Sequence, residues 1–144
     1  MIAKTRERTL KLARDTLTIE AAALQTMRDR LEGVNADALV LAVELLHGCK
    51  GRIVVSGIGK SGHIARKIAA TFASTGSPAF FVHPAEASHG DLGMVTRDDV
   101  FVALSNSGET AELLTIVPIV KRTGAKLIAL TGNPESSLAS SRCM

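Results

Sequence analysis

The pattern of apolar and polar positions begins with a long helical segment at the N-terminus. Residues 2–31 contain neither Gly nor Pro, and Leu10, Leu17, Leu24 and Leu31 recur every seven residues. This spacing predicts one long helix over residues 2–31 with an apolar seam along one side. The seam is suited either to packing within the chain or to packing on another subunit.

A second helix is predicted over residues 36–47, after Gly33 ends the first helix. Asn35 precedes this segment and is of a residue type that commonly caps helix N-termini. The helix would place its apolar residues on one face, namely Leu39, Val40, Val43 and Leu46.

The rest of the chain alternates between short apolar runs and helical patterns. The runs predict four strands, over residues 52–56, 79–82, 100–104 and 126–131. Helices are predicted over residues 63–74, with Ile64, Ile68 and Phe72 on the apolar face, and over residues 109–123, with a kink at Pro118. The alternation predicts right-handed crossovers and an α/β fold, a three-layer sandwich with a parallel sheet between helices. Ligands of such sheets bind beyond the carboxyl ends of the strands.

Composition and charge argue against several classes of function. The net charge is +3 with dispersed basic residues, and there is no Trp or Tyr, so neither a compact basic stripe nor stacking aromatics favour a nucleic-acid partner. No run reaches the roughly 18 apolar residues of a membrane span, and charged residues interrupt the N-terminus where a signal peptide would be apolar. Cys49 and Cys143 form no disulfide or zinc spacing. We therefore expect one cytoplasmic domain.

The glycine-rich stretch VVSGIGKSGHIARK, which begins at Val54, can be interpreted in three ways. A nucleotide P-loop would need a glycine at position 54, where the chain has valine. The dinucleotide pattern G-x-G-x-x-G is present, but the second strand leads into His83 and a proline instead of the acidic residue that would bind a ribose. The remaining interpretation is a helix N-terminus that binds a phosphate, assisted by Lys60 and Ser61.

A second polar corner, SNSGET over residues 105–110, follows the third strand and opens the next helix. Capping by Ser107, with Thr110 at the next turn, explains one or two of these residues but not three hydroxyls, an amide and a glycine together. Two such corners at one sheet edge predict a small ligand with a single phosphate, bound without a metal ion.

These motifs resemble the sugar isomerase (SIS) domain family. The resemblance rests on SNSGET and GIGKSGH and is strengthened by TFASTG, FFVHP and ASHGDLGMV over residues 71–76, 80–84 and 87–95, which are similar to the arabinose-5-phosphate isomerases of that family. It covers nearly the whole chain. It implies a flavodoxin-like fold and the interconversion of D-arabinose 5-phosphate and D-ribulose 5-phosphate for the lipopolysaccharide sugar Kdo. It also implies a phosphorylated pentose as substrate, no cofactor and a homo-oligomer, which is a tetramer in the family.

The resemblance also implies roles for individual residues. The catalytic residues would be Lys60, Glu112 and His89. The substrate-binding residues would be Gly59, Ser61, Gly76, Ser77, His83, His89, Ser105, Asn106, Ser107 and Thr110. The resemblance further implies that His83 can bind an inhibitory zinc ion. Without the resemblance, Glu112 would be read as a solvent-facing helix residue and the two histidines as ordinary polar loop residues.

Members of the family continue beyond the position of Met144 with a further strand, a loop bearing a catalytic glutamate, a long helix and a catalytic histidine, and often a pair of CBS domains. We therefore expect residues 1–144 to be a partial SIS domain without CBS domains and without the last strand and helix. Such a chain is expected to bind a phosphosugar weakly and to turn it over slowly. Two alternatives are a non-catalytic phosphosugar-binding regulatory module and a nicotinamide-dependent oxidoreductase.

Overall fold

A computed structural model describes residues 2–88 and 90–141, in two compact units that divide after Leu41. The first unit contains helix α1 (Ile2–Asp29), which confirms the long predicted helix and ends two residues before the expected Leu31. The leucines of its heptad seam are exposed within this unit, Leu17 and Leu24 to 64% each. In the part of the chain that the structure describes, no helix combines the length and the apolar character needed to cross a membrane.

Helix α2 (Val34–His47) begins earlier than predicted, and its expected cap is wrong. Asn35 lies inside the first turn, and its side-chain amide donates a hydrogen bond to the carbonyl of Arg30 at 3.1 Å. Of the predicted apolar face, Leu46 packs against the core, whereas Leu39, Val40 and Val43 are about half exposed. The residues that pack against the sheet follow a different helical spacing, and they are Ala42, Leu45, Leu46 and Cys49.

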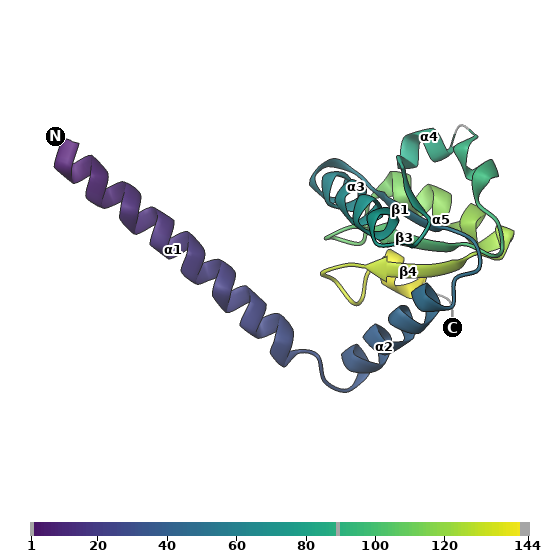
Figure 1. Cartoon of the computed structure of the whole chain (residues 1–144), viewed down its shortest axis with the longest axis horizontal. Helices are drawn as coiled ribbons and strands as arrows, with labels where there is room; N and C mark the ends of the chain where they lie inside the picture. Colours follow the sequence, from purple (N-terminus) through teal and green to yellow (C-terminus); the bar gives the residue numbers. More distant parts are fainter. Residues whose placement is uncertain (1, 89, 142–144) are drawn as a thin grey trace. The chain divides into compact units, whose positions relative to one another are not determined.

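The second unit is built on a sheet of four parallel strands, in the spatial order β2-β1-β3-β4 (Figure 1). The strands are β1 (Ile53–Gly57), β2 (Ala79–Val82), β3 (Val100–Leu104) and β4 (Lys126–Leu130). Their predicted ranges are confirmed to within one residue at either end. Strand β2 lies on one side of β1, and β3 lies on the other side. The topological switch point, where the order of the strands reverses, therefore lies between β1 and β3.

Helices cover both faces of the sheet, so the predicted three-layer α/β sandwich is confirmed. On one face, Val54, Phe101 and Leu127 pack under α5 (Ala111–Thr123), which contains Pro118. The opposite face carries the alternate strand residues, among them Val55 and Val102, under α3 (Gly59–Ser74) and the end of α2 (Figure 1). Both cores are mostly aliphatic, as expected for parallel strands buried under helices.

Helix α3 begins four residues earlier than predicted, and its predicted apolar face is confirmed at Ile68 and Phe72, which pack against the core, but not at Ile64. Ile64 is 57% exposed, whereas Gly62, Ala65 and Ala69 are buried. The small residues are buried because the helix lies close to β1. A Cβ atom on Gly62 would stand only 2.7 Å from the carbonyl oxygen of Gly57.

Gly62→Ala is therefore expected to destabilise the fold by about 2 kcal/mol, because the added methyl group can be accommodated only by shifting backbone. Urea unfolding followed by circular dichroism measures this loss. Gly93→Ala is the matched control, since its Cβ would meet no atom within 4 Å, and it should change stability by no more than about 0.5 kcal/mol. Equal stability of the two variants would contradict this account of the α3–β1 contact.

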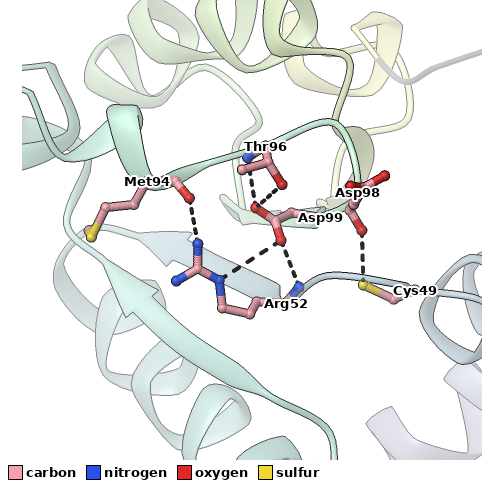
Figure 2. A network of polar contacts seen from close by, with 6 residues as sticks. All are labelled: Cys49, Arg52, Met94, Thr96, Asp98 and Asp99. Atoms are coloured by element: carbon pink, nitrogen blue, oxygen red, sulfur yellow. Dashed lines mark hydrogen bonds and ion pairs between the residues drawn. The ribbon is translucent and has the colours of Figure 1, made fainter.

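The amino edge of the sheet is organised by Asp99, which is 1% exposed. Its carboxylate accepts hydrogen bonds from the backbone N–H of Arg52 at 2.6 Å and from the backbone N–H and hydroxyl of Thr96 at 2.7 and 3.1 Å (Figure 2). The guanidinium of Arg52 donates in turn to the carbonyl of Met94. This network, which ties the start of β1 to the turn before β3, was not predicted. Three short helices were not predicted either: α4 (Pro84–Ser88), η1 (Asp91–Met94) and α6 (Ser137–Ser140).

Candidate functional site

A cavity of ≈ 320 Å³ opens at the carboxyl edge of the sheet, next to the switch point between β1 and β3. The first turns of α3 and the loops after β3 and β4 surround it. Its lining residues are Lys60, Ser61, Ile64, Leu104, Ser105, Asn106, Leu130, Thr131 and Gly132. The two polar corners expected from the sequence therefore meet at one cavity, and four of the predicted site residues line it.

One wall of the cavity is the N-terminus of α3. The helix is preceded by Ile58, which provides no side-chain cap. The first backbone N–H groups of a helix have no partner within it, so the N–H groups at the start of α3 are open to an outside acceptor. Gly59 has a φ of +57°, a conformation that favours glycine at this entry to the helix. Lys60 is exposed and forms no ion pair among the described residues.

The opposite wall includes Ser105 and Asn106, the first two residues of the 105–110 loop, which is organised around the buried hydroxyl of Ser105. This oxygen lies 2.7 Å from the hydroxyl of Thr110 and 3.5 Å from that of Ser107, and it accepts a 3.0 Å hydrogen bond from the N–H of Gly108. Three hydroxyls are thus gathered at one point. Capping by Ser107 is wrong, because α5 begins after Thr110 and the Ser107 hydroxyl instead accepts from the N–H of Glu109.

The other predicted site residues, which include Gly59, Ser107 and Thr110, do not line the cavity, and their substrate-binding roles remain predictions. Glu112 is exposed in the first turn of α5, although at the same edge of the sheet. His83 follows β2, and its Nδ1 accepts a 3.2 Å hydrogen bond from the N–H of Ala85. Gly76 and Ser77 follow α3 at the amino edge of β2, and His89 lies outside the described residues. The assignments of Gly76, Ser77, His83, His89 and Glu112 to a substrate site remain predictions.

The prediction that His83 binds zinc is not supported by a cluster of ligand side chains among the described residues. Among residues 2–88 and 90–141, no group of three or more His, Cys, Asp or Glu side chains lies close enough to bind a metal ion. Zinc sites in proteins are commonly built from three or four such side chains. Zinc binding by His83 therefore stays a prediction.

Glu109 is a residue whose position the sequence did not reveal. Its carboxylate accepts a hydrogen bond from the backbone N–H of Ser137 at 2.7 Å, at the start of α6. This bond, together with one from the Ser137 hydroxyl, lowers the pKa of Glu109 below its usual value of 4.5. A carboxylate at the N-terminus of a later helix could have been found only from knowledge of which segments meet in space.

The lowered pKa of Glu109 gives a pH dependence of stability. The folded state stabilises the charged carboxylate of Glu109 more than the unfolded state does. The contribution of Glu109 to the free energy of unfolding is therefore complete above pH 4.5 and is lost as the pH falls through the lower pKa of the folded state. Wild type should exceed Glu109→Gln in urea midpoint by a constant amount near neutral pH, and this difference should shrink on acidification. A difference that stays the same down to about pH 3 would contradict the bond.

The sheet with its switch point and the hydroxyl-lined cavity define an α/β domain of a kind that binds small ligands at its carboxyl edge. The chain belongs to the SIS domain family, whose model matches residues 45–143. It is similar to the arabinose 5-phosphate isomerase KdsD of Pseudomonas aeruginosa, with 58% identity over 127 residues that make up 88% of this chain and 38% of that protein. The KdsD of Escherichia coli strain K12 is 63% identical over 99 residues, which are 69% of this chain and 30% of that protein.

Solved structures agree with this assignment. An E. coli CFT073 protein in complex with arabinose 5-phosphate has a TM-score of 0.79 and 45% identity, and the match covers 93% of this chain and 71% of that one. A proposed phosphosugar isomerase of capsule formation from Bacteroides fragilis has a TM-score of 0.83 and 41% identity, covering 93% and 70%. The chain spans less than two-fifths of the length of the two curated relatives.

Proposed function

We propose that this chain is a phosphosugar isomerase domain for the interconversion of D-arabinose 5-phosphate and D-ribulose 5-phosphate. The observation that carries the proposal is that one cavity is lined by all four of the following residues: Lys60, Ser61, Ser105 and Asn106. The relatives named arabinose 5-phosphate isomerase, and the solved relative in complex with arabinose 5-phosphate, support this choice of substrate.

The phosphate group of the sugar would bind between the two walls of the cavity. The N-terminus of α3 offers backbone N–H groups and the positive end of the helix dipole, and Lys60 adds a full positive charge. The 105–110 loop offers hydroxyl groups and the Asn106 amide. Donors that converge from two sides suit a tetrahedral phosphate, whose oxygens accept hydrogen bonds in several directions.

Aldose–ketose isomerisation removes the proton from C2 of the aldose and returns a proton to C1, with an enediol between the two steps. The reaction needs a base and an acid near these carbons and positive charge to stabilise the enediolate. We assign the positive charge to Lys60 and the proton transfers to Glu112 and His89. No electrons leave the sugar overall, so the reaction is proposed to run without a redox cofactor.

The proposal is tested with the purified 144-residue chain. Calorimetric titration with arabinose 5-phosphate should show saturable binding, and incubation with the same sugar should produce ribulose 5-phosphate. Binding without product would favour the non-catalytic phosphosugar-binding module. Absence of binding, with inorganic phosphate also failing to bind, would overturn the assignment of the cavity.

The next proposal concerns the oligomeric state of the protein and its location in the cell. We propose a cytoplasmic partial SIS domain, without CBS domains in residues 1–144, that forms a homo-oligomer and has no nucleic-acid or membrane partner. The exposed seam of Leu10, Leu17, Leu24 and Leu31 on α1 supports self-association, because a repeated apolar seam on a helix commonly packs against another helix. Light scattering tests this point, and a monomer at micromolar concentration would contradict it.

A further inference from the structure

The 105–110 loop is held by the chain segment that follows β4, the start of which also lines the cavity. The carbonyl of Asn106 accepts hydrogen bonds from the N–H of Gly132 at 3.0 Å and from the hydroxyl of Thr131 at 3.4 Å. The carbonyl of Gly108 accepts from the N–H of Leu138 at 3.1 Å. Residues 131–138 therefore support the hydroxyl loop along much of its length.

The contact between Gly108 and Ser136 is tightly packed. Gly108 has a φ of +70°, and a Cβ atom there would overlap the side chain of Ser136, which is itself fully buried. The N–H of Gly108 also donates to the Ser105 hydroxyl, around which the hydroxyls of Ser107 and Thr110 gather. A shift of the loop at Gly108 would therefore move Ser105, which lines the cavity.

We propose that Glu109 is a positioning residue that fixes the 105–110 loop in its phosphate-binding conformation by fastening it to the start of α6. Its carboxylate accepts a 2.7 Å hydrogen bond from the N–H of Ser137, which joins this loop to the start of α6. Glu109 is exposed and does not line the cavity, so it acts through the loop and not on the ligand. This inference rests on the proposed phosphate site.

Two substitutions act on the bond from opposite ends. Glu109→Gln weakens it, because the charged acceptor is replaced by a neutral amide oxygen, and Ser137→Pro removes it together with the Ser137 hydroxyl, because proline has no N–H. Proline suits this position, because Ser137 is the first residue of α6 and the preceding Ser136 has the extended ψ of 160° that a residue before proline prefers. Ser137→Pro is expected to bind arabinose 5-phosphate about fivefold more weakly by calorimetry, and Glu109→Gln should lose affinity by a smaller factor. The double variant should bind no more weakly than Ser137→Pro, because the charge at position 109 has no bond to strengthen once the N–H is absent.

Glu135→Gln is the matched control, since it removes the same charge from an exposed carboxylate of the same segment, and it should bind as wild type does. Simple charge repulsion of phosphate by Glu109 would predict tighter binding by Glu109→Gln and no change in Ser137→Pro, and this outcome would overturn the inference. So would wild-type affinity in both single variants, or losses that multiply in the double variant.

A second measurement needs no ligand. Amide hydrogen exchange at Gly108, followed by NMR in the unliganded chain, should be several-fold faster in Glu109→Gln and Ser137→Pro than in wild type and Glu135→Gln. Unchanged exchange at Gly108 would overturn the positioning role whether or not the chain binds a sugar phosphate. Faster exchange in a chain that binds no sugar phosphate would support the positioning of the loop while the proposed function fails.

Discussion

Asp99→Ala is expected to destabilise the domain by about 4 kcal/mol and to lower its Tm by roughly 10–15 °C. The substitution removes the buried acceptor of two backbone N–H groups, those of Arg52 and Thr96, and of the Thr96 hydroxyl. Partly buried donors left without an acceptor cost free energy, and hydrogen bonds to a charged acceptor are the stronger kind. Thermal and urea unfolding followed by circular dichroism measure the loss.

Asp98→Ala is the control for this prediction. Asp98 is the adjacent residue and its side chain is exposed. It joins the network in Figure 2 through its backbone carbonyl, which accepts from the N–H of Gly51 and from the Cys49 thiol. This variant keeps the carbonyl and loses the same charge, so it should unfold within a few degrees of wild type. Similar losses in the two variants would show that net charge, and not the buried acceptor, stabilises this edge.

The strands could be predicted from sequence because each is a short aliphatic run between polar residues. Val100 to Leu104 reads as a strand without knowledge of its neighbours, and the structure confirms its bounds. The parallel arrangement followed from the alternation with helices. The same argument placed Lys60 and Ser105 at one edge, where they line one cavity.

Helix faces were harder to predict, because periodicity shows where large apolar residues recur but not how close a helix lies to the sheet. On α3 the predicted Ile68 and Phe72 pack against the core, but the most buried positions are the small residues Gly62, Ala65 and Ala69, and Ile64 is exposed. Hydrogen bonds between residues far apart in the sequence could not be predicted from local patterns either. Nothing near Glu109 in the sequence indicates that its carboxylate meets the N–H of Ser137, 28 residues away.

Lys60→Met is expected to weaken the binding of arabinose 5-phosphate by about 30-fold in calorimetric titration. Methionine keeps much of the aliphatic side chain but removes the ammonium group from the cavity wall. The loss of one charge-assisted contact to a phosphate accounts for the expected size of the effect. Binding should also become less dependent on ionic strength, because one fewer positive charge attracts the dianion. The fold should be unaffected, since the side chain of Lys60 is exposed.

Lys67→Met is the matched control, because Lys67 lies on the same helix, is exposed and lies two turns from Lys60, outside the cavity. The two variants carry the same net charge, so any general attraction of the chain for anions falls equally in both. A specific phosphate site at the start of α3 requires that Lys67→Met bind nearly as wild type does while Lys60→Met does not. Equal, small losses in the two variants would mean that the ammonium of Lys60 does not contact the phosphate, and the sugar would then have to bind the cavity through the hydroxyl loop alone.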